Sequence, residues 1–491
     1  MKPVRVRFAP SPTGFLHIGG VRSALFNYLL AKQTGGQFIL RLEDTDRERF
    51  VPASVAQIVA GLDWLGLKPD EGFWITNGRH QDLDFIQSER HKTGLYQKWA
   101  DELVKSSLAY YSPTSKDKLD ELRSAAKHDS QAFLYKRSLD DANTDKPIKN
   151  TPIRLDTVAI KAKMKSDKID WVDEVRGSFA NELDLLEDFI LIKSDGFPTY
   201  NFANVVDDND MNITHVIRGD EFIASTAKHA VLYDLFGWKR PVFVHLPVIN
   251  GTDGKKLSKR SGDTDVLDFR THGYLPAALI NFLVLLGWNP GAGETQEVFT
   301  LADLIDRFSL EHVQKSPAVF DPDRLDWMNG LYLRNMTPEV LLDTVTDFLS
   351  GSAFASMLQQ DRTYSLAAIV LVQERLKRLE EAQEQLEFFF TDPNPKALDF
   401  GKLAPDEVRK ALELSVQALT DHPEMVADTG ELERFMRSEV AAKLSDKPGL
   451  TFMALRIALT GQTATPGLFE TMVALGAETV IRRLGAALKA L

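Results

Sequence analysis

The 491-residue chain is 44% hydrophobic and 26% charged, values typical of globular proteins, and its length predicts about three domains of about 150 residues. It has no cysteine, which excludes disulfides, thiolate catalysis, cysteine-bound zinc and iron–sulfur clusters, and which favours a reducing compartment. The net charge of -12 argues against a surface coated with positive charge, although a local basic surface suffices to bind nucleic acid. The longest apolar run, 275–288, is too short to span a bilayer, and the first residues do not resemble a secretion signal, so we expect a cytoplasmic protein without a membrane partner.

The first fifty residues predict a strand, a loop, a helix and a second strand. Apolar residues alternate over 4–8, as in a strand, and turn-forming residues follow at 10–14. Apolar residues then recur at helical spacing over 18–29 until two glycines at 35–36, and an apolar run of strand length occupies 38–42. Two strands joined by a helix form a βαβ unit, which implies a parallel sheet.

The region from about 105 to 190 is rich in Lys and Asp, has few apolar runs and includes a helical stretch at 116–127, so it is interpreted as an insertion. Strand-like segments resume at 189–192, 216–217 and 242–244. Beyond about 275 nearly every segment has helical periodicity, with examples at 341–348, 366–390, 408–419 and 473–491. Pro393 and Pro395 divide this helical part in two.

Polar residues follow four of the predicted strands, and ligands of an open parallel sheet bind beyond the carboxyl ends of its strands. These residues are Arg7, Ser11 and His17, then Glu43, then Arg218 and Glu221, and finally Lys255, Lys256, Lys259 and Arg260. A single charged residue at a strand end is more often solvated than functional. Four such ends together favour one shared site.

Two stretches of this set suit an anionic ligand. His17 precedes Gly19 and Gly20 at the start of a helix, where free N–H groups attract anions and glycines admit a ligand close to the backbone. The alternative is a histidine that only caps the helix. The loop 250–262 places basic residues between glycines, so it could close over a triphosphate as pyrophosphate leaves; the alternative is a solvated basic loop.

Both stretches resemble the signatures of one enzyme class. The HIGH signature of class I aminoacyl-tRNA synthetases resembles Pro10, Ser11, Pro12, Thr13, Gly14, Phe15, Leu16, His17, Ile18, Gly19 and Gly20. The KMSKS signature resembles Lys256, Leu257, Ser258, Lys259 and Arg260. Residues 41–46 resemble the glutamyl branch, and further matches extend to 465–470, so the chain resembles bacterial glutamyl-tRNA synthetases essentially from end to end.

The resemblance implies an α/β fold in which a Rossmann-type parallel-sheet catalytic domain with an α+β insertion is followed by an all-α C-terminal anticodon-binding region. It implies two halves of the catalytic domain, an inserted acceptor-stem (connective) domain, a stem-contact region with the KMSKS-like loop, and two helical anticodon-binding subdomains. In chain order these parts are 1–105 (catalytic), 106–190 (insertion), 191–255 (catalytic), 256–325 (stem contact), 326–392 and 393–491 (anticodon binding).

The family's reaction has two steps. Glutamate attacks the α-phosphate of ATP to give glutamyl-adenylate and pyrophosphate, and the 3′-terminal adenosine of tRNA(Glu) then takes the acyl group. The resemblance assigns catalysis to His17, Lys256 and Lys259. It assigns ATP binding to His17, Gly19, Gly20, Glu221 and Lys259, and glutamate binding to Arg7, Ser11, Glu43, Tyr200, Asn204 and Arg218. Arg7 would pair with the side-chain carboxylate of glutamate, and Mg²⁺ would arrive with ATP rather than in a protein cage.

Many bacterial members bind zinc through a Cys-x-Cys pair in the inserted domain. The corresponding stretch here, 109–113, has no cysteine, so we expect no zinc and no other metal site in the protein. The family is also expected to act as a monomer.

Arg375 aligns with the family's reader of the third anticodon base. The resemblance therefore implies an enzyme that rejects tRNA(Gln). We also expect Arg375 on a continuous helix, on the face that carries Leu371 and Leu379. The alternative for Arg375 is a solvated helix face. The alternatives for the whole chain are an enzyme that also glutamylates tRNA(Gln), a non-tRNA nucleotidyltransferase, and a catalytically inactive RNA-binding protein.

Overall fold

The computed structural model describes residues 3–76, 79–114, 116–128, 133–137, 150–257, 265–291, 293–444 and 448–491. The chain divides into two compact units. The first consists of Met1–Phe269 with Leu279–Asp321, and the second of Arg270–Ala278 with Pro322–Leu491. The six-part division expected from the sequence is finer than this and stays a prediction. Within the described ranges, no helix is both long and apolar enough to cross a membrane.

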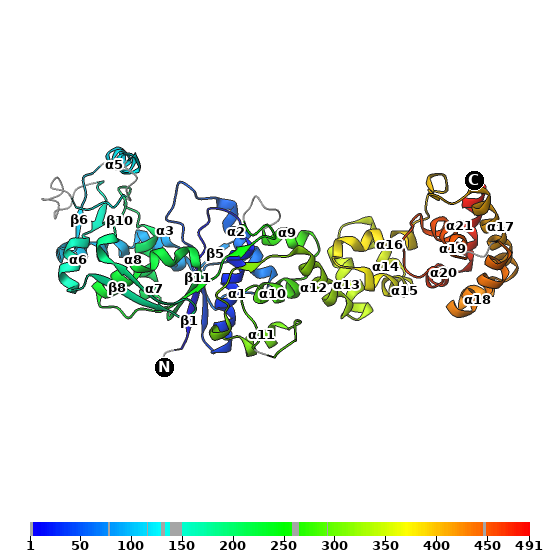
Figure 1. The fold of residues 1–491 in the computed structure, drawn as a ribbon, viewed down its shortest axis with the longest axis horizontal. Coiled ribbons are helices and arrows are strands. Elements are labelled where there is room, and N and C mark those ends of the chain that lie inside the picture. The colour runs from blue at the N-terminus through cyan, green and yellow to red at the C-terminus, as the bar shows by residue number, and fades with distance from the viewer. Residues whose placement is uncertain are drawn as a thin grey trace. The chain divides into compact units, whose positions relative to one another are not determined.

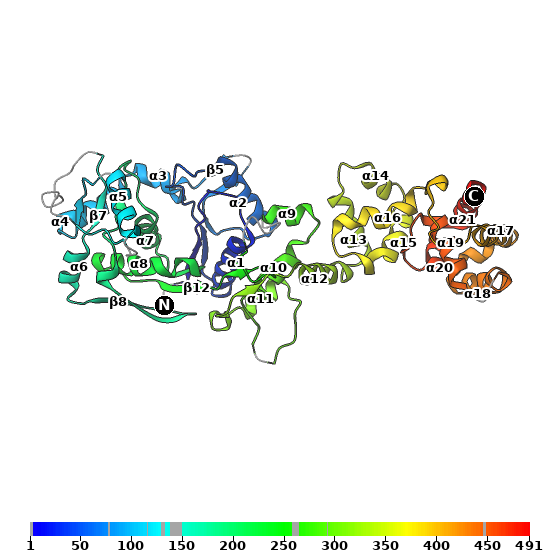
Figure 2. The same cartoon turned by 45° about the horizontal axis from the view of Figure 1, so that its top comes forward.

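The first unit begins with the predicted βαβ element. Strand β1 (Arg5–Phe8) pairs in parallel with β2 (Gln37–Leu40), and α1 (Ile18–Gln33) connects them. The short strand β3 (Glu71–Gly72) extends this sheet beside β2. The buried side chains of α1 include Leu25 and Phe26, and Phe26 packs edge-on against Phe308 with ring centroids 5.3 Å apart. Figure 2 shows α11 (Leu301–Arg307), which is distant in sequence, beside α1.

A second sheet of this unit has the strand order β11 (His215–Gly219), β12 (Val242–Leu246), β8 (Lys168–Asp173) and β9 (Gly177–Glu182). Strands β11 and β12 are parallel, and Thr214, just before β11, donates its N–H to the carbonyl of Arg5 over 2.9 Å. The two sheets therefore meet along β1, and the predicted parallel α/β architecture is confirmed. Strand β8 comes from the region interpreted as an insertion, yet it pairs with β12 of the parallel sheet.

The rest of that region forms an antiparallel sheet in the order β10 (Ile190–Ile192), β7 (Ile153–Leu155) and β6 (Ala109–Tyr111). Helices α5 (Lys116–His128) and α6 (Thr157–Met164) lie near it, as Figure 1 shows. The remaining elements are α2 (Pro52–Trp64), α3 (Gln87–Lys92), α4 (Leu95–Lys105), α7 (Tyr200–Asp210), α8 (Ile223–Phe236), α9 (Val266–Thr271), α10 (Pro276–Leu285), β4 (Trp74–Thr76), β5 (Arg79–Gln81), β13 (Ile249–Asn250) and β14 (Ala318–Val319).

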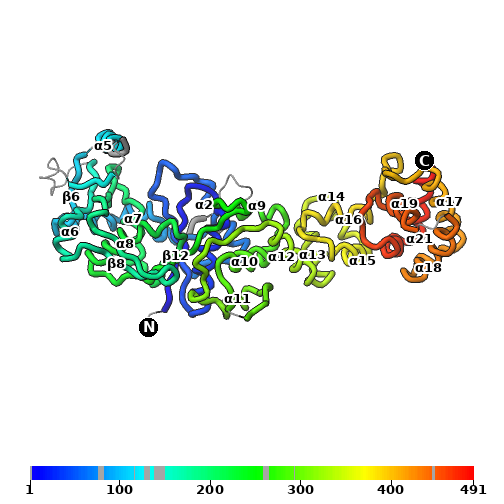
Figure 3. Tube along the Cα trace, viewed as in Figure 1, coloured from blue at the N-terminus to red at the C-terminus, as the bar shows by residue number. Residues whose placement is uncertain are grey.

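The second unit is helical throughout the residues described, as predicted. Its helices are α12 (Pro322–Arg334), α13 (Pro338–Phe348), α14 (Ala353–Gln360), α15 (Arg362–Val372), α16 (Ala382–Phe390), α17 (Pro405–Asp421), α18 (Thr429–Glu439), α19 (Pro448–Thr460), α20 (Leu468–Leu475) and α21 (Ala477–Ala490). Figure 3 shows α17 to α21 gathered in the orange-to-red part of the trace. One buried cluster, which includes Leu412, Leu455 and Leu484, runs through these helices.

Two predicted helices are interrupted. The stretch 366–390 was expected to be one helix, but α15 ends at Val372 and α16 starts only at Ala382, with extended backbone at the buried Leu376 between two 3₁₀ turns. The stretch 473–491 is broken at Gly476, whose φ of 79° is left-handed. Buried residues continue through both breaks, so the apolar periodicity alone does not reveal them.

Candidate functional site

A cavity of about 1570 Å³ opens in the first unit beyond the carboxyl ends of β1, β2 and β11. All described residues that the sequence assigned to glutamate, ATP or catalysis line it: Arg7, Ser11, His17, Gly19, Gly20, Glu43, Tyr200, Asn204, Arg218, Glu221 and Lys256. Ser258, Lys259 and Arg260 lie outside the described residues. The strand ends therefore bring these residues together in one place, whereas Lys255, which was predicted with them, does not line the cavity.

His17 caps the first helix. Its backbone is extended, and its Nδ1 accepts a hydrogen bond from the Gly20 N–H over 3.2 Å. The capping alternative is thus correct, but the imidazole also lines the cavity, so the two interpretations are compatible. A Cβ on Gly19 would lie 3.1 Å from the His17 ring, which means that a side chain at this position would crowd the imidazole.

One wall of the cavity is built from buried ion pairs. Arg7 donates from Nε and Nη2 to the two carboxylate oxygens of Asp208 over 3.0 and 3.2 Å. Arg41 donates to Asp208 over 2.7 Å and to Glu43 Oε1 over 2.9 Å. Asn204 donates to the same Oε1 over 2.8 Å. Arg7 Nη1 and Glu43 Oε2 have no partner among the described residues, so each leaves one polar atom for a ligand.

Burial and the neighbouring arginines have opposite effects on the pKa values of the carboxyl groups in this wall. Burial raises the pKa of Glu43, and Arg41 and Arg7 offset only part of that rise. Burial acts in the same direction on Asp208, but Arg7 and Arg41 outweigh it and hold the pKa of Asp208 below its ordinary value. Asp208 therefore stays ionised. A cationic ligand group next to Glu43 would stabilise the ionised form of the Glu43 carboxylate.

Another wall of the cavity contains an arginine with neutral partners. Arg218 is 6% exposed, and it forms no ion pair with any carboxylate in the described part of the chain. Its Nε donates to His245 Nε2 over 3.1 Å. Its terminal nitrogens donate to the hydroxyls of Tyr200 and Thr226 over 3.0 Å each. Two longer contacts, to His229 Nδ1 at 3.5 Å and to the Phe222 carbonyl at 3.4 Å, are weak.

The groups around Arg218 stay neutral. Burial lowers the pKa of His229 well below its ordinary value, and the positive charge of Arg218 lowers it further. Burial also lowers the pKa of His245, although Asp173 acts against it. Burial raises the pKa of the Tyr200 hydroxyl. Arg218 is thus a buried cation beside the cavity whose charge is not neutralised by direct contact, which suits an anionic ligand.

The basic loop meets the cavity at its described end. Lys256 Nζ lies 3.9 Å from the carboxylate of Glu221, and both side chains are about half exposed. A Cβ on Gly219 would lie 2.3 Å from the Glu221 carboxylate, so glycine lets that side chain fold back over the strand end. The Leu257 N–H donates to the Ile249 carbonyl over 2.9 Å, which ties this end of the loop to β13.

Sequence reasoning missed the residues that hold the binding groups. Arg41 and Asp208 support one wall, and Asp173, Thr226 and His245 support the other. Two signals were available: His245 is a polar residue in the apolar segment 242–249, and Arg41 belongs to the stretch 41–46 that resembles the glutamyl branch. Their partners come from distant elements that only the fold identifies.

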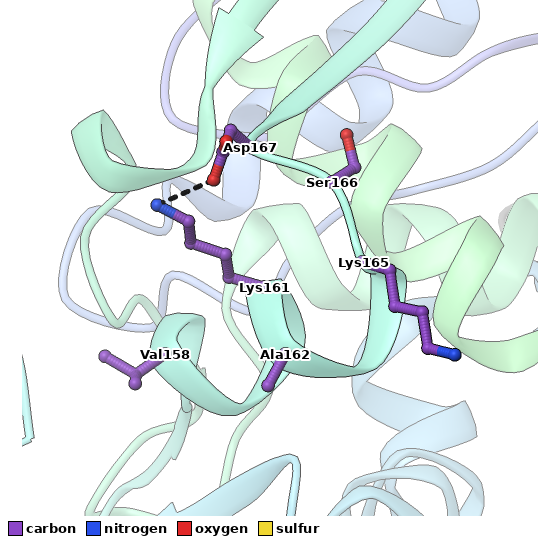
Figure 4. Close-up of a pocket in the computed structure, with 6 residues that line it drawn as sticks. All are labelled: Val158, Lys161, Ala162, Lys165, Ser166 and Asp167. Atoms are coloured by element: carbon purple, nitrogen blue, oxygen red, sulfur yellow. Dashed lines mark ion pairs between the residues drawn. The ribbon is translucent and has the colours of Figure 1, made fainter.

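No group of three or more His, Asp or Glu side chains that could hold a metal ion occurs among the described residues. A second, shallow hollow of about 360 Å³ lies on α6 (Figure 4). There Lys161 Nζ forms an ion pair with Asp167 over 2.9 Å, and the lining contains none of the predicted site residues.

Arg375 lies in the second unit, in the 3₁₀ turn Gln373–Arg375 after α15. The expected continuous helix, and with it the expected shared face with Leu371 and Leu379, is wrong. The guanidinium donates to Gln385 over 3.3 Å and to the carbonyls of Thr465 and Ala464 over 3.2 and 3.4 Å. No acid of the described chain pairs with it, so its charge, like that of Arg218, has only neutral partners.

Two family descriptions match the chain. Residues 3–327 match the catalytic domain of class I tRNA synthetases (E and Q), and residues 340–488 match an anticodon-binding domain. These ranges follow the division between the α/β unit and the helical unit.

Curated proteins and a solved structure resemble the chain over its whole length. The glutamate–tRNA ligase of Chloroflexus aurantiacus is 41% identical, with 100% of this chain and 98% of the relative covered. That of Finegoldia magna is 40% identical, with 99% and 100% covered. The crystal structure of a glutamate tRNA ligase from Elizabethkingia meningosepticum in complex with its amino acid matches with a TM-score of 0.83 and 32% identity, covering 99% of each chain.

Proposed function

Because the chain belongs to the class I tRNA synthetases of the glutamyl and glutaminyl branch, we propose that it is a glutamate–tRNA ligase, which forms glutamyl-adenylate from ATP and transfers the glutamyl group to the 3′-terminal adenosine of tRNA(Glu). The environment of Arg218 is the observation that supports glutamate as the substrate. This buried guanidinium beside the cavity has no carboxylate partner in the described part of the chain, so it favours an anionic ligand, and a substrate carboxylate supplies that charge.

The cavity residues predicted to bind glutamate have the following roles in this reaction. Arg218, with Tyr200, binds one carboxylate of glutamate, and the remaining Nη1 donor of Arg7 contributes to carboxylate recognition. The vacant Oε2 of Glu43 accepts the ammonium group together with the exposed hydroxyl of Ser11, while Asn204 fixes the Glu43 carboxylate. Glutamine, with an amide in place of the side-chain carboxylate, would offer one negative charge fewer to the cation Arg218.

The ATP site lies at the N-terminus of α1. His17, Gly19 and Gly20 present an imidazole and open backbone to the nucleotide, and the helix dipole favours its phosphates. Lys256 and Lys259 of the basic loop stabilise the charge that develops as pyrophosphate leaves, and Glu221 faces Lys256 at the edge of the site. The protein's contribution is positioning and charge stabilisation.

Magnesium accompanies ATP in this proposal. Mg²⁺ binds phosphate oxygens with few protein ligands, so it needs no preformed cluster of protein carboxylates. We expect no structural zinc, because the chain has no cysteine. Elemental analysis of the purified protein tests this, and one equivalent of zinc that resists a chelator would contradict it.

The helical unit binds the anticodon stem and loop of tRNA(Glu), and Arg375 reads the third anticodon base. We place the reaction in the cytoplasm and the protein in solution as a monomer. The six segments expected from the sequence remain our proposal for the division of labour, with 106–190 at the acceptor stem.

The experiment that tests the function is aminoacylation of bulk tRNA with labelled glutamate, ATP and Mg²⁺. We expect glutamyl-tRNA to form, and Lys259→Ala to lower the rate by about 100-fold or more, as loss of one transition-state contact typically does. Lys239→Ala, which changes an exposed lysine that does not line the cavity, is the matched control and is expected to stay close to wild type. A wild-type protein that charges no tRNA with glutamate would overturn the proposal.

A further inference from the structure

Two buried residues behind Arg218 have no role in the reaction described so far. His245 lies on β12 and is fully buried, and Asp173 ends β8 and is 1% exposed. His245 Nδ1 lies 2.6 Å from Asp173 Oδ2, and its Nε2 lies 3.1 Å from Arg218 Nε. Neither His245 nor Asp173 lines the cavity.

The geometry of these contacts determines which atoms carry the protons. Arg218 Nε can only donate, so His245 Nε2 accepts and the neutral imidazole carries its proton on Nδ1, which it donates to Asp173. Asp173 Oδ1 accepts three backbone N–H groups, from Val175 over 3.1 Å, from Arg176 over 2.8 Å and, more weakly, from His245 over 3.4 Å. The turn after β8 thus fixes the carboxylate, and the carboxylate fixes the tautomer of the imidazole.

We propose that Asp173 and His245 are positioning residues that aim Arg218 at the substrate carboxylate while they keep negative charge off its guanidinium. This inference rests on the proposed function. A carboxylate in direct contact, as Asp208 contacts Arg7, would hold the side chain but would also compete with glutamate. An imidazole placed between Asp173 and Arg218 holds Nε with a neutral acceptor, and the weak contacts to His229 and Phe222 remain exchangeable for substrate oxygens.

His245 Nε2 also lies 3.2 Å from the Thr226 hydroxyl, so the imidazole has one contact at Nδ1 and two at Nε2. Two substitutions of His245 separate the contact at Nδ1 from those at Nε2. In His245→Asn the amide reaches only the place of Nδ1, so the contact with Asp173 is kept and the acceptor for Arg218 is lost. In His245→Gln the amide oxygen reaches the place of Nε2, so the acceptor is kept. We expect His245→Asn to raise the KM for glutamate about tenfold in charging of tRNA(Glu), with the KM for ATP and kcat nearly unchanged, and His245→Gln to stay within about threefold of wild type.

Asp173→Asn tests the tautomer. An asparagine can keep its oxygen on the N–H groups of Val175 and Arg176 while it donates to His245 Nδ1, which moves the imidazole proton to Nε2, against the N–H of Arg218. The KM for glutamate should therefore rise here as well. Asp170→Asn, on the exposed face of the same strand, is the control and should leave that KM unchanged.

A wild-type KM for glutamate in both His245→Asn and Asp173→Asn would overturn the inference, and so would losses in kcat and in ATP affinity as large as the loss for glutamate. If His245→Asn does not fold, Asp173→Asn against Asp170→Asn decides. Charging of tRNA(Glu) by the wild type tests the function separately, so an active wild type with unaffected variants would remove only the positioning role.

Discussion

The two walls of the cavity differ in the groups that contact their buried arginines. On one wall Arg7 and Arg41 share Asp208, so the positive charges are balanced within the protein. On the other wall Arg218 is held by an imidazole and two hydroxyls, and no carboxylate of the described chain touches it. The first arrangement contributes to the architecture of the site, because its charges satisfy one another before any ligand binds. The second leaves a buried positive charge that is balanced only when an anionic ligand binds. Burial alone therefore does not distinguish a structural arginine from a ligand-binding one.

Asp208→Asn should have the largest effect on stability, because it leaves two buried guanidinium groups without their shared anion. Breaking a buried pair by removing one partner typically costs about 3–5 kcal/mol. Urea unfolding should show this loss in the free energy of unfolding. Asp234→Asn, which removes a partly exposed partner of Arg240, should cost less than about 1 kcal/mol. Equal losses for the two variants would remove the distinction between the walls.

Arg218→Gln should act mainly on substrate binding. It removes a cation that pairs with no carboxylate among the described residues, so none of these carboxylates loses a partner. The loss of one charge-assisted contact is worth about 1.5–3 kcal/mol. We expect the KM for glutamate to rise by roughly 10- to 150-fold while the urea midpoint changes little. Arg240→Gln, away from the cavity, is the control in the same unit. A large fall in stability with an unchanged KM would show that Arg218 belongs with the architectural arginines.

Arg375→Gln extends the comparison to the helical unit, where this arginine also has only neutral partners. If it reads an anticodon base, its loss should cost about 1–3 kcal/mol of discrimination. The ratio of kcat/KM for tRNA(Glu) over tRNA(Gln) should fall, while glutamate and ATP parameters stay the same. Lys377→Gln, an exposed neighbour, is the control. An unchanged ratio for Arg375→Gln would place the reading role elsewhere.

The pH dependence of stability gives the smallest effect. Burial and Arg218 hold the pKa of His229 well below 6.5, so the folded protein stays unprotonated there while the unfolded chain takes up a proton below about pH 6.5. The unfolding free energy should therefore fall as the pH drops from about 6.5, by at most about 1.4 kcal/mol per pH unit for this group. His229→Gln should flatten that slope, and His422→Gln, on the surface of the other unit, should not. A slope that is the same in all three proteins would contradict the assignment.

The sequence predicts much of this picture because the residues that meet substrate stand at strand ends. Arg7 in β1 and Arg218 in β11 lie near the carboxyl ends of their strands, and Glu43 follows β2. A parallel sheet brings such ends to one edge. The residues that hold them are different: His245 and Asp173 lie in separate strands and meet only because β8 joins β12. The register of distant strands is a tertiary property, so no local pattern predicts their contact.

The breaks in the helical unit were missed for a related reason. Gln373 donates to the carbonyls of Leu333 and Met336, at the end of α12, and these bonds stabilise the turn that ends α15. Because Leu376 and Leu379 are buried at nearly helical spacing, the sequence favours a continuous helix that tertiary contacts override.

The contacts that surround Arg218 also determine when its conformational entropy is lost. A free arginine side chain loses about 1.5–2 kcal/mol of rotamer freedom when it is fixed. Here the guanidinium is fixed by His245, Tyr200 and Thr226 as the protein folds. The side-chain entropy is therefore lost on folding and not on binding, and glutamate binds to a side chain that is already ordered. A small dicarboxylate offers few atoms for contact, and preorganisation of this kind lets more of its interaction energy appear as affinity.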